Sequence, residues 1–430
     1  MANYNGGAGL NQQALNKLSK DIYDSVYPTF FKGEIEIGKF GIKKITWDIT
    51  QTPVFDLNPS EKAISILKEM ASNKLDDTGL INQLHSYIEE SVITFELSVP
   101  VFEVTVETTE GDTSLPIKGS ITVYNQAEIT VDNKLVGKII DAEIGIEGEP
   151  TLVWILNHIV LPVVEDQLNK ILLKGIQLPT LSFGDVKIST PVAALESETL
   201  LAFAALSSHG PTEPPEPGSP WPQDKFFALS DHILIETVAV EVLKNTQQSG
   251  RAHTTIGTLS LEASYTAGVK NPSVQLTGGN QLTMGVVAYG SGTLKAQLWP
   301  FPAASLGIGF KANPVVSARV SVDESNNVIV KLLSVNDFKL EIDIPGMPGW
   351  LKSFLSGIIS FLTRPIVQLI GTLILQTISS FVVYTIPEFT IDLEGKKLDI
   401  LVSGIDISTI TDSGNKKLLT VTGDVEVKKE

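Results

Sequence analysis

One order of predicted elements occurs twice in this chain, once on each side of a proline-rich segment. The segment, residues 207–223 (SSHGPTEPPEPGSPWPQ), carries six prolines, which remove backbone hydrogen-bond donors and favour an extended, polyproline-like path. It divides the 430 residues almost in half. We therefore expect two similar units, residues 1–206 and 224–430, joined by a linker.

Each half opens with a helix and continues into long strands. The helical stripes have a period near 3.6 and follow, in the second half, a predicted N-cap at Ser230: Leu10, Ala14, Leu15, Leu18, Ile22 and Val26, then Ile233, Ile235, Val238, Ala239, Val242 and Leu243. Alternating residues 93–106 change parity at Pro100, which predicts a bulge in a bent strand. Residues 257–268 and 316–335 also alternate, with a turn at Asn326 and Asn327.

Both halves close with an apolar helix that contains a proline, followed by a proline-led strand. The predicted helices are residues 151–172 with Pro162 and residues 350–381 with Pro365; the strands are residues 176–189 and 384–393. A proline inside a helix costs about 3 kcal/mol unless the fold needs a kink. Its recurrence at matching places indicates a duplicated module.

The uncharged stretch 365–387 has the length of a membrane span. Polar residues nevertheless recur every four positions and lie on one helical face: Arg364, Gln368, Thr372, Gln376 and Ser380. A lipid-spanning helix needs no such stripe, so we expect a helix of a soluble protein that buries its other faces.

Residues 60–90 have no counterpart in the second half. They read as two short amphipathic helices, joined across LDDTG. We expect this helical insertion to offer a docking surface for a partner protein or a membrane.

Charge and residue content exclude several functions. The net charge is −17, the first half is the more acidic, and only three residues are Arg, which excludes nucleic acid as the main ligand. Without Cys there is no disulfide or thiolate metal site. The five His are scattered, no Gly-x-Ser-x-Gly occurs, and residues 33–39 (GEIEIGK) alternate as a strand does rather than forming a phosphate loop. We predict a non-enzymatic protein with no metal and no cofactor.

No secretory signal is visible in MANYNGGAGLNQQ, which has neither a basic nor an apolar region. We expect a bacterial protein that stays in the cytoplasm or is released without a classical signal.

Three segments carry a resemblance to a known family. They are residues 158–189, residues 226–240 (FFALSDHILIETVAV) and residues 385–408. With the repeated order of elements, they resemble the tubular lipid-binding superfamily, in particular the bactericidal/permeability-increasing and lipopolysaccharide-binding family; clostridial P47-like proteins are also similar.

The resemblance implies an α+β fold of two tandem elongated barrels that meet at a central sheet. Each barrel would be a twisted antiparallel sheet wrapped around a long helix, in a pseudo-symmetric boomerang: residues 1–206 with the insertion 60–90, linker 207–223, and residues 224–430. In this family an apolar slot between helix and sheet holds the acyl chains of a phospholipid or fatty acid. The acidic first half argues against lipopolysaccharide as the ligand.

We predict two sets of slot residues from the apolar helical faces. The first is Leu15, Leu18, Ile22, Ile155, Ile159 and Val163; the second is Ile235, Val238, Val242, Ile358, Leu362, Ile366, Leu369 and Leu373. Periodicity alone favours a closed core, and the slot interpretation rests on the family resemblance. A different class of function is a toxin-associated accessory or interaction protein, which would use the same fold as a scaffold.

Overall fold

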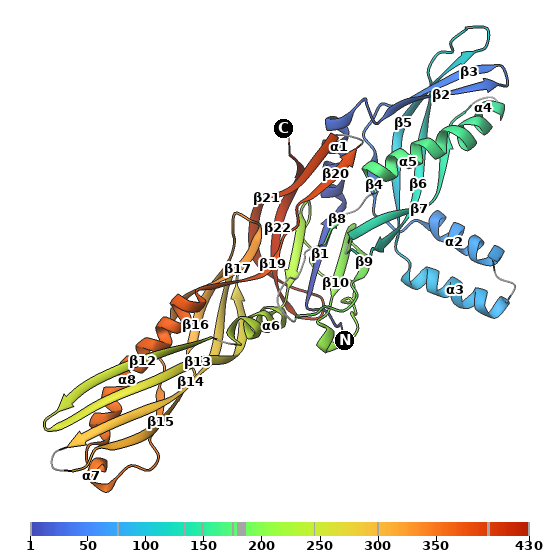
Figure 1. Ribbon diagram of the computed structural model, residues 1–430. Helices are drawn as coiled ribbons and strands as arrows, with labels where there is room; N and C mark the ends of the chain where they lie inside the picture. The colour runs from blue at the N-terminus through green and yellow to red at the C-terminus, as the bar shows by residue number, and fades with distance from the viewer. Residues whose placement is uncertain are drawn as a thin grey trace.

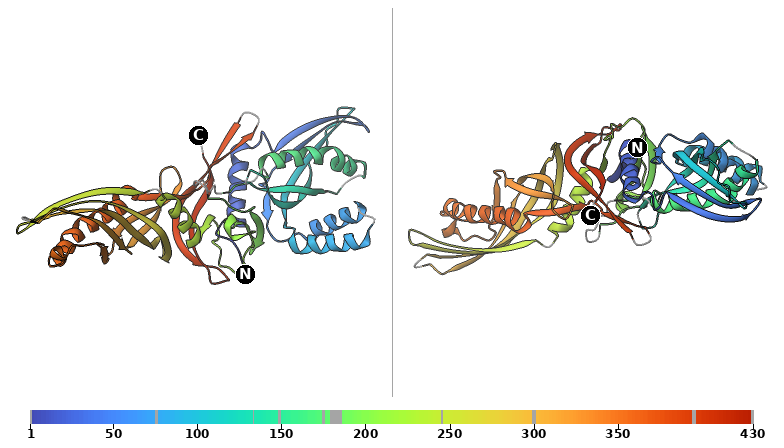
Figure 2. Two further views of the ribbon diagram at one scale, coloured as in Figure 1. Left: turned by 60° about the horizontal axis from the view of Figure 1, so that its bottom comes forward. Right: turned by 90° about the horizontal axis from the view of Figure 1, so that it is seen from above.

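Three antiparallel sheets follow one another along an elongated molecule (Figure 1). The computed structural model describes residues 2–74, 77–132, 134–147, 150–173, 176–178, 186–244, 246–298, 301–393 and 396–428. Two of the sheets are curled half-barrels at opposite ends, and the third lies between them, as the two views of Figure 2 also show. The fold is thus mixed α+β; the boomerang symmetry and the complete wrapping of sheet around helix stay predictions.

The first half-barrel has the strand order β2-β3-β5-β6-β7-β8, with β4 paired to β5. Its strands are β2 (Lys32–Lys39), β3 (Ile42–Ile49), β4 (Val54–Asp56), β5 (Thr94–Thr108), β6 (Ile117–Ile129), β7 (Lys134–Gly145) and β8 (Ile176–Gln177). The register of β5 against β6 shifts between Val99 and Phe102, so the predicted bulge is confirmed. Residues 33–39 form a strand, as the alternation indicated; the middle half of the predicted strand 176–189, residues 179–185, lies outside the described residues.

The second half-barrel has the order β12-β13-β14-β16-β17-β19, and β15 joins β14 to β18. Its strands are β12 (Gln247–Ile256), β13 (Leu259–Gly278), β14 (Gln281–Leu298), β15 (Ala304–Ala312), β16 (Val315–Val322), β17 (Asn327–Val335), β18 (Leu340–Asp343) and β19 (Ser380–Thr385). The predicted turn is present: Asn326 has φ 58°, a left-handed conformation that Asn tolerates better than most residues, and Asn327 begins β17.

The central sheet combines strands from both halves in the order β20-β21-β22-β11-β1-β10-β9. These strands are β1 (Gly6–Asn11), β9 (Val192–Glu196), β10 (Thr199–Ala204), β11 (Phe226–Ser230), β20 (Phe389–Leu393), β21 (Lys396–Thr411) and β22 (Lys417–Val427). One face joins the core beneath the helices, and the other buries a separate cluster: Tyr4, Leu201, Phe203, Trp221, Phe227, Leu229 and Leu418.

The proline-rich segment is fixed to this second face. Trp221 is buried, stacks on Phe227 and donates a hydrogen bond from Nε1 to Glu196 Oε2 at 2.6 Å. The segment contains a short 3-10 turn, Ser207–His209, and its residue Glu213 bridges Asn3. It therefore covers the sheet as well as connecting the halves.

The described α-helices range from 4 to 18 residues, and the longest contains Pro365. They are α1 (Gln12–Val26), α2 (Glu61–Lys74), α3 (Thr78–Ser91), α4 (Pro150–Ile155), α5 (Leu161–Ile171), α6 (His232–Leu243), α7 (Gly349–Lys352) and α8 (Leu355–Thr372). A π-helical turn, Leu156–Val160, joins α4 to α5 directly before Pro162, and a second, Leu373–Ile378, extends α8. The α2–α3 pair is the predicted insertion, and it projects from the first half-barrel (Figure 1).

Three predicted helix limits are wrong. Leu10, which the first helical stripe includes, lies in β1, and α1 begins only at Gln12. The N-cap of α6 is Asp231, whose Oδ1 accepts from Leu234 N at 2.8 Å, whereas Ser230 is the last residue of β11. The last helix ends at Ile378 and not at residue 381, because Ser380 already pairs with Lys331 in β17. Sheet pairing prevails over the helical stripe there, so Ser380 does not belong to the stripe.

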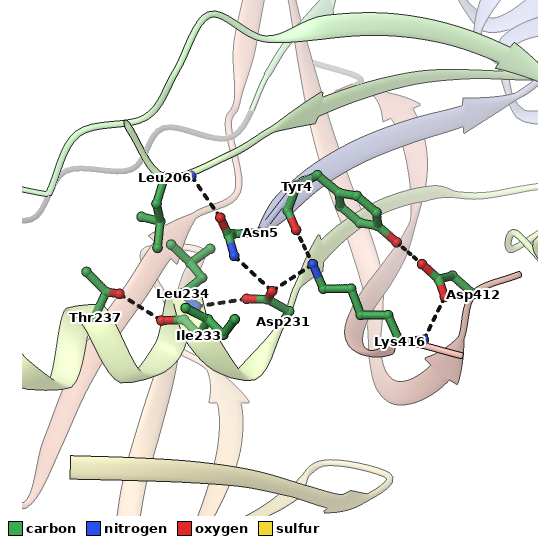
Figure 3. A network of polar contacts seen from close by, with 9 residues as sticks. All are labelled: Tyr4, Asn5, Leu206, Asp231, Ile233, Leu234, Thr237, Asp412 and Lys416. Carbon is green, nitrogen blue, oxygen red and sulfur yellow. Dashed lines mark hydrogen bonds and ion pairs between the residues drawn. The ribbon is translucent and has the colours of Figure 1, made fainter. Parts of the chain in front are cut away.

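A buried polar network ties α6 to the central sheet (Figure 3). Asp231 Oδ2 lies 2.8 Å from Lys416 Nζ and accepts from Asn5 Nδ2 at 3.0 Å. Lys416 Nζ also donates to the Tyr4 carbonyl, and the Tyr4 hydroxyl donates to Asp412. Burial, together with that hydrogen bond, raises the pKa of Tyr4, so the phenol stays protonated. The network joins the N-terminal strand, the start of α6 and the β21–β22 turn.

Candidate functional site

An apolar cavity of about 50 Å³ lies where α1 meets the first half-barrel and the central sheet. Three residues of α1, Leu15, Leu18 and Ile22, form one wall. The other described lining residues are Phe55, Phe95, Leu135, Val136, Gly137, Ile171, Leu172, Leu173, Leu200, Ile391 and Ile400. A ligand here would meet only hydrocarbon side chains and one glycine among them.

Polar contacts along one flank of α1 orient its apolar face towards this cavity. Asn16 Oδ1 accepts from Phe55 N at 2.6 Å, and Asn16 Nδ2 donates to the Phe55 carbonyl at 3.0 Å. Ser19 Oγ donates to the Pro53 carbonyl at 2.6 Å. The N-cap of the helix is Asn11, whose side-chain oxygen accepts from Gln13 N. Because these bonds fix the rotation of α1 against β4, its row of Leu and Ile faces the cavity.

Gly137 of β7 allows the opposite wall to close. A Cβ atom there would lie 2.7 Å from Phe95 Cζ and 2.8 Å from Leu173 Cδ2, closer than carbon atoms approach. The phenylalanine ring and the leucine side chain therefore meet over the glycine. Any larger residue at position 137 would have to displace one of them or enter the cavity.

The volume decides what the cavity holds without rearrangement. Sites for drug-sized ligands measure roughly 300 to 1,000 Å³, and one water occupies about 30 Å³ of liquid. At about 50 Å³ the cavity is too small for a long acyl chain. Binding such a chain requires its lining side chains to move apart.

The structure brings together half of the first predicted set. Leu15, Leu18 and Ile22 line the cavity, whereas Ile155, Ile159 and Val163 are not among its lining residues. Ile155 is fully buried, and the other two are half-buried against the same core. Helix α5 lines the cavity instead through Ile171, its last residue.

The residues of the second predicted set belong to α6 and to α8 with its π-helical extension, in the second half-barrel. Six of its members are buried: Ile235, Val238, Ile358, Leu362, Ile366 and Leu373. Val242 and Leu369 are half-buried beside them. Helix α8 lies along β12 and β13 on one side and β18 on the other, with Arg364 and Gln368 exposed. The predicted polar stripe thus lies on the solvent-exposed face of α8.

Within the described residues, Leu355–Gln376 is the one helix long and apolar enough to cross a membrane, judged by length and composition. Its mean hydropathy is 1.8, and 33% of its most apolar window is buried. Many apolar side chains of this helix are therefore only partly covered.

Two polar residues of α5, Glu165 and Gln167, lie in poorly solvated surroundings beside the first half-barrel sheet. Burial, and then the nearby Asp141, raises the pKa of Glu165. The Oε1 atom of Gln167 is buried without a hydrogen-bond partner. His158 is exposed at the rim and stacks on Trp154 at 4.6 Å, and the described residues contain no cluster of His, Asp or Glu suited to a metal.

Sequence reasoning missed the lining residues from β4, β5, β7, β10, β20 and β21. These residues lie far apart in the sequence, and strand pairing brings them together. One local signal was available: Gly137 interrupts the alternating apolar pattern of β7, and a glycine inside a strand often marks a close approach.

Comparisons with known proteins find structural likeness at low sequence identity. No family model matches the sequence, and no curated protein matches it. P47 from Clostridium botulinum A2 is similar over 98% of this chain and 97% of its own, with 11% identity and a TM-score of 0.42. P47 of Clostridium botulinum E1 is similar over 98% of this chain and 99% of its own, with 10% identity and a TM-score of 0.40. A lipopolysaccharide binding protein is similar over 99% of this chain and 100% of its own, with 10% identity and a TM-score of 0.35. The chain is therefore similar in structure to P47 and to a lipopolysaccharide binding protein.

Proposed function

We propose that this protein is a non-enzymatic carrier that binds the acyl chains of a phospholipid or fatty acid. The observation that carries the proposal is the cavity beside α1, whose described lining is entirely apolar and includes Leu15, Leu18 and Ile22. An acyl chain is the biological ligand whose chemistry matches such a lining. Its head group would stay at the mouth, in water.

The energy of acyl burial is large enough to open the cavity. Each buried methylene contributes about 0.8 kcal/mol, so a chain of about 16 carbons contributes roughly 10 kcal/mol before ordering costs. Displacing a few lining side chains costs about 1 to 3 kcal/mol by analogy with overpacked cores. The balance favours binding.

The second half-barrel offers a second place for an acyl chain, along α8. Apolar residues of α8 itself, such as Phe361 and Leu369, are only half-buried, and the sheet edge at β18 lies beside the helix. We propose that a chain lies in this seam, next to the fully buried row of Ile358, Leu362 and Ile366.

Extraction and uptake test the proposal. Protein purified without detergent is extracted with organic solvent and analysed by mass spectrometry, and delipidated protein is titrated with a fluorescent fatty acid. We expect stoichiometric lipid or saturable uptake. If neither is found, the carrier function is wrong.

One pair of variants locates the first site. Leu135→Trp places bulk in the cavity from β7, on the same face of the strand as Gly137, and we expect it to remove one binding equivalent. Ile144→Trp is the matched control, since Ile144 is likewise buried on the same strand but is not a lining residue. Equal uptake by both variants would place the lipid elsewhere.

A protein-interaction role is the second candidate, and the α2–α3 pair favours it. Helix α3 packs on α2, and Leu80 and Tyr87 on α3 are 52% and 58% exposed. An exposed amphipathic helix of this kind can occupy a groove on a partner. Failure of lipid binding, with a partner captured by the whole protein but not by a Leu80→Asp, Tyr87→Asp variant, would favour this role.

A further inference from the structure

The distal end of the second half-barrel is almost without charge. Three parts of the described chain meet there: residues 254–261, residues 296–298 with 301–310, and residues 344–363. Together they contain one charged residue, Lys352, in a chain where 19% of residues are charged. Figure 1 shows the β12–β13 hairpin, the start of β15 and α7 at this end. The absence of charge therefore belongs to one surface and not to one stretch of sequence.

Large apolar side chains are exposed on this surface. The rings of Phe301 and Trp350 stack at 5.4 Å and an angle of 7°, and Phe301 is 44% exposed. Leu355, at the start of α8, is 40% exposed. We call residues 301–303 and 347–355 the α7 tip.

We propose that the α7 tip inserts into the interface of a lipid bilayer. Trp and Phe favour the boundary between head groups and acyl chains, where an aromatic ring replaces water by lipid. Lys352 is exposed, and its long stem can keep the ammonium group at the phosphate level while neighbouring residues enter the acyl region. No acidic residue of the three segments opposes this placement.

The charge distribution orients the molecule on such a surface. The first half carries most of the net charge of −17 and lies at the opposite end of the molecule (Figure 2). An anionic lipid surface repels that half and leaves the neutral tip nearest the bilayer. Because the tip carries little charge, apolar contact should dominate, and binding should depend weakly on salt.

The first half-barrel provides a contrasting exposed aromatic pair. Phe40 and Trp154 are 63% and 48% exposed, with ring centres 6.3 Å apart. The chain on either side of Phe40 is charged: Lys39 precedes it, Lys43 pairs with Glu107, and Gly41 accepts a hydrogen bond from Thr109, the neighbour of Glu110. Such charges are costly to bring into a bilayer. Exposed aromatic rings alone therefore do not distinguish the α7 tip; the lack of charge around them does.

This proposal goes beyond the carrier function and does not depend on it. Vesicle binding measures bilayer docking, whereas uptake of a soluble fatty acid measures acyl-chain binding. Failure of one leaves the other standing. If both hold, helix α8 leads from the tip along the second half-barrel, so a chain could pass from bilayer to seam without crossing water.

The test is co-sedimentation of the full chain with phosphatidylcholine vesicles. We expect the wild-type protein to bind, with less than a twofold change between 0.1 and 0.5 M NaCl. Phe301→Asp should lower the partition coefficient at least about tenfold, since an apolar anchor is replaced by a charge. Phe40→Asp, the matched control, should bind within twofold of wild type. Leu355→Asp tests the same surface if Phe301→Asp does not fold.

Three results would overturn the proposal. One is absence of binding by the wild-type chain, and another is an equal loss in the Phe301→Asp and Phe40→Asp variants. The third is concentration-dependent dimerisation, measured by sedimentation, that Phe301→Asp abolishes while vesicle binding is unchanged. That outcome would assign the tip to a second copy of the chain.

Discussion

Replacing Lys416 by Met should destabilise the protein by about 3 kcal/mol, because the carboxylate of Asp231 would lose its cation inside the structure. Asp231 is fully buried, and its Oδ2 lies 2.8 Å from Lys416 Nζ. Removing one partner of a buried ion pair costs about 3 to 5 kcal/mol. Asp231 keeps hydrogen bonds from Asn5 and Leu234, and the Lys416 side chain is 24% exposed, so we expect the lower end of that range.

Urea unfolding followed by circular dichroism measures this loss. Lys417→Met is the matched control: the residue is exposed on the neighbouring position, so its change should stay within about 0.5 kcal/mol. Adding Asp231→Asn to Lys416→Met should recover much of the stability, since Asn can still accept from Leu234 N while burying no charge. A Lys416→Met protein within about 1 kcal/mol of wild type would refute the reasoning that this pair depends on burial.

Four further substitutions have distinct expected outcomes. Leu369→Trp, at a half-buried position, should lower fatty-acid uptake with little loss of stability, whereas Ile366→Trp, at a fully buried one, should cost about 1 to 3 kcal/mol in urea unfolding. Because the pKa of Glu165 is raised above 4.5, stability falls as pH rises through the interval above that value; Glu165→Gln should therefore raise the melting temperature at pH 7 and leave it unchanged at pH 4. Gly9→Ala should lower the melting temperature, since its Cβ would lie 2.4 Å from Phe227 Cζ.

Periodicity predicted the elements whose burial is set locally. The row Leu15, Leu18 and Ile22 identified α1 and its inward face, and the parity change at Pro100 identified the bulge of β5. These signals hold because one face of the element is covered along its whole length. For the same reason Leu15, Leu18 and Ile22 line the cavity; their binding of lipid stays a prediction.

Competition between neighbouring elements could not be predicted from the pattern. Ser230 and Asp231 are both good N-caps, and the pairing of Ser230 with Leu419 in β22 decides that Asp231 begins the helix. The opposite wall of the cavity depends on strands brought together from residues 55 to 400. Local sequence carries no record of that pairing. The helical period of residues 151–172 therefore does not distinguish Ile171, which lines the cavity, from Ile155, Ile159 and Val163, which do not.

The position of β1 between β10 and β11 affects how the protein is made. Gly6 pairs with Ala204 and with Ser230, roughly 200 residues later in the chain. A ribosome that adds about 5 to 20 residues per second needs on the order of ten to forty seconds to supply these partners. The waiting strand, GGAGLN, is half glycine and has low β propensity, so it offers a poor template for pairing with other chains. We infer that the centre of the molecule folds last, after β22 leaves the ribosome.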